Sequence, residues 1–183
     1  VVLLPVLGSP ARAEAFKPEI RYAQVGDVKL AYYIRGQGRP LLMINGFVST
    51  MSLWDPLLLA ELSKNRQLIL FDNRGVGLST DTVENKTTIP QMADDAAGLI
   101  KSLGLQKPDV LGWSMGASVI LKMFAQGYCG KGALMLVSGN PSLVQRDGYE
   151  SALAPAVVRR LYRQVQRDYP RGLNTFLNLL CTP

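Results

Sequence analysis

The chain has 183 residues, of which 48% are hydrophobic and 19% charged, and its formal net charge is +6. With 17 glycines, 11 prolines and 2 cysteines, this composition excludes a collagen-like chain, a disulfide-dense mini-protein and a disordered protein, and it describes a globular domain. The sequence contains no histidine, so these residues supply neither an imidazole base nor an imidazole metal ligand.

Residues 1–15, VVLLPVLGSPARAEA, have the pattern of the later part of a secretory signal peptide. A short apolar run is broken at Gly8 and Pro10, and the small residues that follow suit cleavage after Ala13 or Ala15. The pattern predicts an exported protein, periplasmic or secreted. A frayed apolar terminus or an anchor remnant is the alternative. Elsewhere no apolar run approaches the roughly 18 residues that a membrane span needs.

Strand patterns recur along the rest of the chain. Glu19–Val25 and Val28–Ile34 predict a hairpin, because the Gly26-Asp27 pair between them suits the positive φ of a tight turn. Continuous apolar runs, typical of buried parallel strands, follow at Pro40–Ile44, Gln67–Phe71, Asp109–Gly112 and Ala133–Val137.

Helix patterns lie between these strands. They are predicted at Trp54–Leu62, from Thr88 and Pro90 to a stop at Gly104, and at Val119–Phe124. In the second of them the apolar residues recur at helical spacing: Met92, Ala96, Leu99, Ile100 and Leu103. The alternation predicts an α/β fold with a mostly parallel sheet and helices on both faces.

The pattern changes after Asn140-Pro141. Residues Ser151 to Leu180 look helical throughout, with a break at Pro170 and Gly172 and with apolar residues at steps of four: Leu153, Val157, Leu161 and Val165. A helical segment after a strand of an α/β sheet predicts a lid, and a plain crossover helix is the alternative. The arginines of this segment are partly balanced by acidic residues, so the basic excess is expected to be spread rather than gathered in a nucleic-acid stripe.

The motif that carries chemistry is Gly112-Trp113-Ser114-Met115-Gly116, at the junction of a predicted strand and a predicted helix. In a G-x-S-x-G turn the serine backbone is strained and its hydroxyl is exposed above the sheet, which makes Ser114 the candidate nucleophile. The amide of Met115 lies at the start of the predicted helix and is a candidate oxyanion donor. A glycine-rich helix start with a structural serine is the alternative.

A second oxyanion donor is expected from a neighbouring loop, because ligands gather at the carboxyl ends of parallel strands. Asn45-Gly46-Phe47 follows the third predicted strand, and Gly46 permits a close backbone approach. The amide of Phe47 is therefore the candidate second donor. A simple strand-ending turn is the alternative.

Three stretches together resemble the α/β-hydrolase family: MINGFVSTMSLWD at Met43–Asp55, FDNRGVGLST at Phe71–Thr80 and VLGWSMGAS at Val110–Ser118. The resemblance implies the α/β-hydrolase fold, with a core at 16–140 and the start of a helical cap at 141–183, after the signal-peptide remnant that the residue pattern predicts at 1–15. It also makes one set of residues in the second stretch a structural turn: Asp72, Arg74, Gly75, Gly77 and Ser79.

The same resemblance implies a serine hydrolase with Ser114 as nucleophile and the amides of Phe47 and Met115 as oxyanion hole. Family members such as haloalkane dehalogenases and epoxide hydrolases carry Asp at the nucleophile position. Serine therefore points to a small carboxylic ester, a lactone, a thioester or peracid chemistry. Phe47, Trp113 and Met115, with Trp54, are candidates for an apolar acyl pocket, and core packing is the alternative for each.

The chain departs from the family pattern in two ways. Asn45-Gly46 stands where much of the family has His-Gly, which changes a side chain and keeps the backbone donor. The family order is Ser, Asp, His, yet no histidine follows Ser114, and Asp147 and Asp168 lie in or beside the expected cap. We therefore expect these residues to be the first two-thirds of an α/β-hydrolase, truncated and nearly inert alone, with the triad acid and base beyond residue 183.

The competing hypothesis is a non-catalytic binding module of the same fold, or an inactive fragment. No cofactor motif and no metal-ligand cluster is present in the sequence. The expected partner is a small-molecule acyl substrate, with no nucleic acid and no membrane span. Cys129 and Cys181 are expected to be semi-buried thiols, although export would allow a disulfide. The acyl group and the oligomeric state stay open.

Overall fold

The structure is a computed structural model that describes residues 16–82, 87–128, 132–139, 142, 144–150, 152–168, 170–172, 174–175 and 178. The chain falls into two compact units, Val1–Gly139 and Asn140–Pro183. The predicted signal peptide, Cys129 and Cys181 lie outside the described residues. Within the described ranges, no helix has the length and apolar content that crossing a membrane requires.

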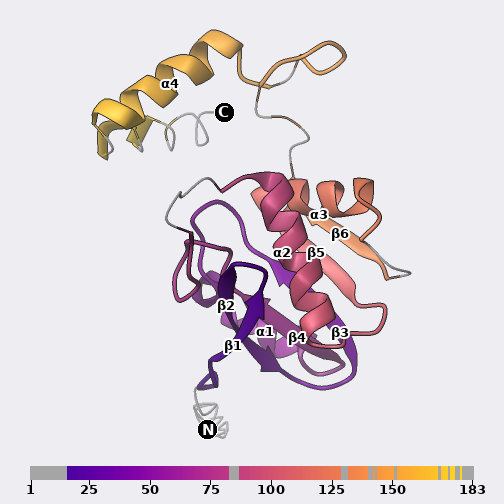
Figure 1. The fold of residues 1–183 in the computed structure, drawn as a ribbon. Coiled ribbons are helices and arrows are strands. Elements are labelled where there is room, and N and C mark those ends of the chain that lie inside the picture. The colour runs from indigo at the N-terminus through magenta and orange to yellow at the C-terminus, as the bar shows by residue number, and fades with distance from the viewer. Residues whose placement is uncertain are drawn as a thin grey trace, which may run out of the picture. The chain divides into compact units, whose positions relative to one another are not determined.

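The described strands of the first unit form one sheet of six in the order β1-β2-β4-β3-β5-β6 (Figure 1). Their bounds are β1 Arg21–Val25, β2 Val28–Arg35, β3 Arg39–Ile44, β4 Arg66–Phe71, β5 Asp109–Trp113 and β6 Leu134–Val137. β2 pairs antiparallel with β1 and β4, whereas β4, β3, β5 and β6 pair parallel. The predicted mixed and mostly parallel sheet is confirmed, and the carboxyl ends of four strands meet at one edge.

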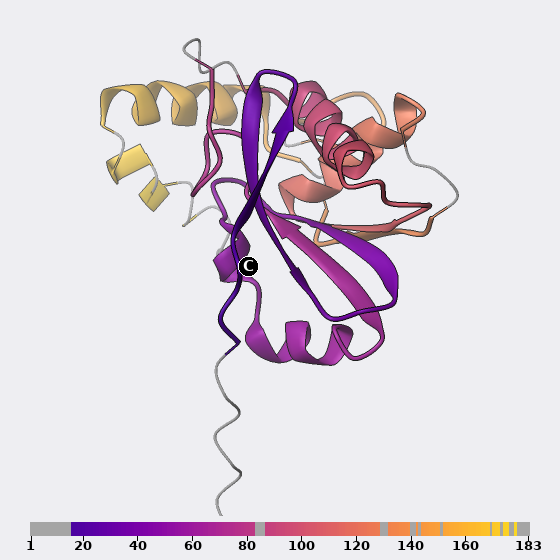
Figure 2. The same cartoon turned by 60° about the horizontal axis from the view of Figure 1, so that its bottom comes forward.

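Helical segments cover both faces of this sheet: η1 (Met51–Leu53), α1 (Pro56–Leu62), α2 (Ile89–Ser102) and α3 (Met115–Ala125). Successive side chains of a strand point to opposite faces, so Leu42 and Ile69 pack with α2 and α3, whereas Leu41 and Leu68 pack with η1 and α1. Figure 2 shows α1 on the other side of the strands from α2 and α3.

The first α-helix begins later than the sequence pattern predicted. The Asp55 carboxylate accepts hydrogen bonds from the Leu57 and Leu58 amides at 2.9 and 2.8 Å, which makes Asp55 the N-cap and Pro56 the first helical residue. Trp54 lies before this cap in the buried cluster. The predicted start at Trp54 is therefore wrong by two residues, because apolar periodicity does not distinguish a helical residue from a buried one beside it.

In the second unit, α4 spans Pro155–Arg167. Leu153, predicted to be helical, instead forms a bridge with Val144, because Pro155 fixes the helix start and Ala154 before it is extended (φ −57°, ψ 142°). Residues 170–172 are again helical, and a Cβ at Gly172 would lie 2.6 Å from the Val165 Cα, so the two helical segments pack backbone to backbone.

Charge in this unit differs from the expectation that the basic excess is spread. α4 contains four arginines and no acidic residue: Arg159, Arg160, Arg163 and Arg167. At about 100° per residue, they occupy one side of the helix. The expectation is wrong here, because counting charges along the chain does not show on which face of a helix they fall.

Candidate active site

Ser114 alone connects β5 to α3, because the strand ends at Trp113 and the helix begins at Met115. Its backbone has φ 56° and ψ −119°, a conformation that residues with a Cβ rarely adopt. The Ser114 amide donates to the Val137 carbonyl of β6 at 2.9 Å. The residue is exposed, and its hydroxyl has no hydrogen-bond partner among the described residues. The strained turn thus presents a free hydroxyl at the carboxyl edge of the sheet.

The two glycines of the motif are required by close backbone contacts. A Cβ at Gly112 would fall on the Gly116 carbonyl and lie 2.7 Å from the Ala117 nitrogen. A Cβ at Gly116 would meet the Ile44 carbonyl oxygen and lie 3.0 Å from the Asn45 oxygen. α3 therefore starts directly against β5 and against the end of β3. This contact places the first turn of α3 beside the loop that follows β3.

The loop after β3 lies against the serine. A Cβ at Gly46 would be 3.2 Å from the Ser114 Cβ and 3.7 Å from its Oγ. The Phe47 amide donates to no acceptor within the described part of the chain, and Met115 is the first residue of α3, where an amide has no intrahelical acceptor. The structure therefore gathers the predicted nucleophile and both predicted amide donors at one edge, and their joint action on an oxyanion stays a prediction.

Val48 is a feature of this loop that sequence reasoning missed. The Ser49 amide donates to the Gly46 carbonyl at 3.4 Å and closes a turn in which Val48 has φ 55°. Positive φ in a β-branched residue is uncommon and strained. No signal in the sequence marks it, because valine gives no hint of this backbone conformation. Strain on both sides of the candidate oxyanion site, at Val48 and Ser114, is typical of functional loops.

Asn45, directly after β3, forms hydrogen bonds to the end of β4 and to the turn that follows it. Its side chain is 1% exposed, and its Nδ2 donates to the Phe71 carbonyl of β4 at 3.1 Å. Its carbonyl oxygen accepts from the Asn73 Nδ2 at 3.5 Å. The Oδ1 is buried without a partner among the described residues. Sequence reasoning treated Asn45 only as a departure from the family pattern, whereas the structure gives it a buried link between β3 and β4.

The four candidate acyl-pocket residues fall into two groups. Trp54 is 9% exposed and belongs to the core, and Met115 packs against the opposite core cluster. Phe47 and Trp113 are 68% and 37% exposed. The Trp113 ring lies 6.0 Å from the Trp54 ring at a tilt of 53°. Core packing therefore accounts for Trp54, while Phe47 and Trp113 present apolar surface beside the serine.

The turn after β4 is held by buried polar contacts. The Asp72 carboxylate accepts from the Met51 amide at 2.7 Å and from the Leu78 amide at 2.8 Å. The Arg74 guanidinium donates to both Asp95 carboxylate oxygens at 2.7 Å. Burial raises the pKa of Asp95, and the hydrogen bonds from Arg74 act against that rise. These contacts fix the loop to η1 and α2, which agrees with a structural reading of Asp72 and Arg74.

The site brings together a candidate nucleophile and candidate amide donors, and the 183 residues contain no histidine that could serve as an imidazole base. A serine hydroxyl without a base is a weak nucleophile at neutral pH. No group of three or more Cys, Asp or Glu within the described ranges is placed to hold a metal ion.

Comparison with known proteins bears on this geometry. A family model described as alpha/beta hydrolase fold matches residues 39–179. The pimeloyl-(acyl-carrier protein) methyl ester esterase of Nitrosomonas europaea is 27% identical over 144 residues, which cover 79% of this chain and 54% of that protein.

Solved structures of an esterase and a lactonase also match the chain. An esterase from Exiguobacterium antarcticum matches with a TM-score of 0.74 and 27% identity, over 85% of this chain and 59% of that one. The N-acyl homoserine lactonase AidH, complexed with N-butanoyl homoserine, matches with a TM-score of 0.62 and 27% identity, over 68% of this chain and 46% of that one. The chain thus spans about half the length of these relatives.

Proposed function

Because the chain belongs to the α/β-hydrolase fold family, we propose that it is the nucleophile-bearing part of a serine hydrolase that cleaves a small carboxylic ester, lactone or thioester. The observation that carries the proposal is the backbone of Ser114, at φ 56° and ψ −119°, with an exposed hydroxyl. Such strain costs about 1–3 kcal/mol and persists where surrounding structure enforces it, most often at active sites.

The chemistry follows from the positions of the groups. The Ser114 Oγ attacks the acyl carbonyl carbon and passes its proton to a base, while the carbonyl oxygen gains negative charge. The amides of Phe47 and Met115 stabilise that oxyanion. Collapse expels the alcohol or thiol, which takes the proton from the base, and leaves an acyl group on Ser114. Water then releases the carboxylic acid by the same steps. The 183 residues contain no histidine, so a histidine base has to come from other residues, and the proposal assigns the base and its acid partner to chain beyond residue 183.

The substrate class is supported by the surface beside the serine and by the relatives. Phe47 and Trp113 expose apolar rings next to Ser114, which suits an apolar acyl group rather than a charged one. The matched proteins named above are an esterase, a methyl ester esterase and a lactonase. All three names refer to an ester bond, because a lactone is a cyclic ester.

Active-site labelling tests the proposal. The full-length product of the gene is treated with a fluorophosphonate, which bonds covalently to an activated serine, and is assayed with p-nitrophenyl butyrate. We expect labelling and ester hydrolysis in the wild type, loss of both in Ser114→Ala, and retention of both in the control Ser102→Ala, which changes an exposed serine at the end of α2.

A non-catalytic binding module is the second candidate, favoured by the lack of any histidine in these residues. It requires that the full-length product binds butyrate esters saturably without hydrolysing them, and that Ser114 stays unlabelled. That outcome contradicts the hydrolase proposal.

A further inference from the structure

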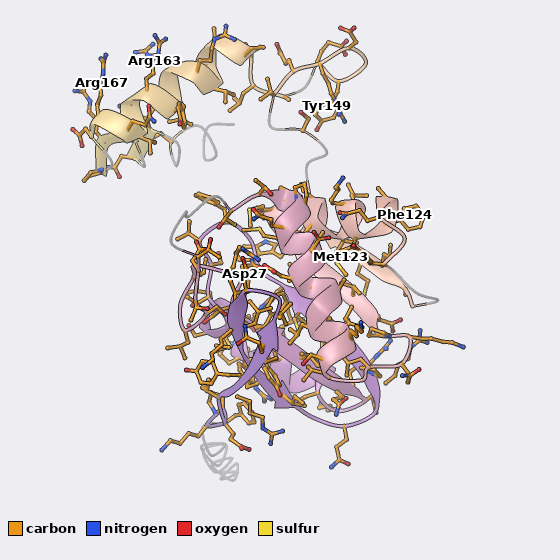
Figure 3. The ribbon with its side chains drawn as sticks, viewed as in Figure 1. Asp27, Met123, Phe124, Tyr149, Arg163 and Arg167 are labelled. Carbon is orange, nitrogen blue, oxygen red and sulfur yellow. The ribbon has the colours of Figure 1, made fainter. Side chains whose placement is uncertain are left out.

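The arginine face, defined as Arg159, Arg160, Arg163 and Arg167 of α4, is a cationic surface that the proposed hydrolysis does not use. At 3.6 residues per turn, these four positions fall within an arc of about 100°. All four residues are exposed, and Figure 3 shows Arg163 and Arg167 projecting from the same side of the helix. No large apolar side chain lies within that arc, where the remaining residue is Ala156.

The apolar side of α4 packs in part against its own unit. Leu161 is buried and Val158 and Val165 are half-buried. The backbone at Gly172 packs against Val165, and the Gln164 Nε2 donates to the Thr175 Oγ1 at 2.9 Å. Val157 and Tyr162 are 37% and 63% exposed, so contacts within the unit cover the apolar side of α4 only in part. The arginines occupy a side of the helix that these contacts leave open.

The four guanidinium groups lack carboxylate partners within the described part of the chain. In the first unit, by contrast, Arg39 and Arg66 pair with Asp109, and Arg74 pairs with Asp95. Like charges at i and i+4, as at Arg159–Arg163 and Arg163–Arg167, repel one another. An anionic surface outside the chain would remove that repulsion.

We propose that the arginine face docks on an anionic phospholipid surface. Guanidinium forks donate paired hydrogen bonds to phosphate oxygens, and the face extends over about 12 Å, the rise of eight helical residues. Such a row of charges matches a plane of headgroups. A specific protein interface has an apolar core with aromatic anchors, which this arc lacks. Binding is peripheral and electrostatic, so salt must weaken it.

Vesicle cosedimentation of the whole chain tests this docking. The probes are vesicles of phosphatidylcholine alone and vesicles in which phosphatidylglycerol replaces a third of it. We expect binding to the anionic vesicles only, and release at high salt. The variant Arg159→Gln/Arg163→Gln/Arg167→Gln is expected to lower the partition coefficient by about 100-fold, since each arginine near an anionic surface contributes about fivefold.

The control variant is Lys17→Gln/Lys29→Gln/Lys101→Gln, which removes the same charge from exposed positions of the first unit and is expected to bind as the wild type does. Glutamine is a good helix former, and circular dichroism checks that α4 is retained. Equal binding to neutral vesicles, indifference to salt, or an equal loss in the control overturns the proposal. Salt-sensitive binding to polyglutamate or to DNA, without a preference for anionic vesicles, also overturns the proposal. This last comparison needs only the wild-type protein.

Discussion

At the scale of single residues, two substitutions at Ser114 distinguish the role of its hydroxyl from the backbone strain of the turn. The residue adopts φ 56° although it carries a Cβ, and only glycine adopts such a conformation without steric cost. Ser114→Gly and Ser114→Ala both remove the nucleophile, but only the glycine variant relieves the strain. Stability and reactivity at this position are therefore opposed.

We expect Ser114→Gly to raise the free energy of unfolding by about 1 kcal/mol, since strain of about 1–3 kcal/mol is relieved at the cost of added chain entropy in the unfolded state. Ser114→Ala keeps the Cβ and is expected to stay within about 0.5 kcal/mol of the wild type. Urea denaturation followed by circular dichroism measures both. Equal stabilities of the two variants would contradict a strained serine.

Sequence reasoning singled out Ser114 as a candidate because glycine and serine at fixed spacing reflect steric demands that the structure shows at Gly112 and Gly116. It singled out Gly46 and Phe47 because they follow a buried strand. It could not find the positive φ of Val48 or the buried link of Asn45. Both depend on how the loop packs against neighbouring strands. A residue's type carries little information about such contacts.

At the scale of elements, the buried strands could be predicted because continuous apolar runs are needed wherever both faces of a sheet are covered. Helix limits were less predictable. The start of α1 depends on the cap at Asp55, and Leu153 kept the apolar spacing of α4 while lying outside it. Spacing reports burial, whereas hydrogen bonds and Pro155 decide where a helix begins.

The link between α2 and the turn after β4 rests on one buried ion pair. Arg74 is 6% exposed and is held by Asp95. We expect Asp95→Asn to lower the free energy of unfolding by about 3 kcal/mol, because it leaves the buried guanidinium only the exposed Asp27, at 3.2 Å, as a charge partner. The double variant Arg74→Met/Asp95→Leu is expected to be less destabilised than the single variant, because no unpaired charge remains.

Denaturation by guanidinium chloride measures the free energies of unfolding of the wild type and both variants, with Lys64→Gln as the control. Lys64 pairs with Glu61 at an exposed position of α1, where such pairs contribute less than about 1 kcal/mol. A loss in Asp95→Asn no larger than that of the control would contradict the importance of the buried pair.

At the scale of the whole molecule, Asp109 joins strands at the sheet edge opposite Ser114. It begins β5 and accepts from Arg39 at 2.6 Å, from Arg66 and from the Ala133 amide at 2.7 Å. Burial raises the pKa of this carboxyl, but the hydrogen bonds from the Ala133 amide and Arg66 and the charges of Arg39 and Arg66 outweigh burial, so its pKa is lowered. One carboxylate thus links β5 to β3, β4 and the start of β6.

The lowered pKa gives a stability that depends on pH. A carboxyl whose pKa is lower in the folded state stabilises the fold above its unfolded pKa, about 4, and this contribution is lost as the pH falls through the folded pKa. We expect the free energy of unfolding to decrease below about pH 4, and Asp109→Asn to be less stable at neutral pH with a flatter acid limb. Urea titrations between pH 2 and pH 7 measure this, and an unchanged acid limb in Asp109→Asn would contradict it.

The hydrogen bond from the Ser114 amide to the Val137 carbonyl bears on the order in which contacts form while the chain is synthesised. This hydrogen bond can form only after β6, which lies later in the chain, has left the ribosome and paired with β5. At about 5–20 residues per second, the ribosome adds the intervening segment within a few seconds. During that interval the nascent chain lacks one of the contacts that hold Ser114, so the backbone geometry at Ser114 is completed only when β6 has paired with β5.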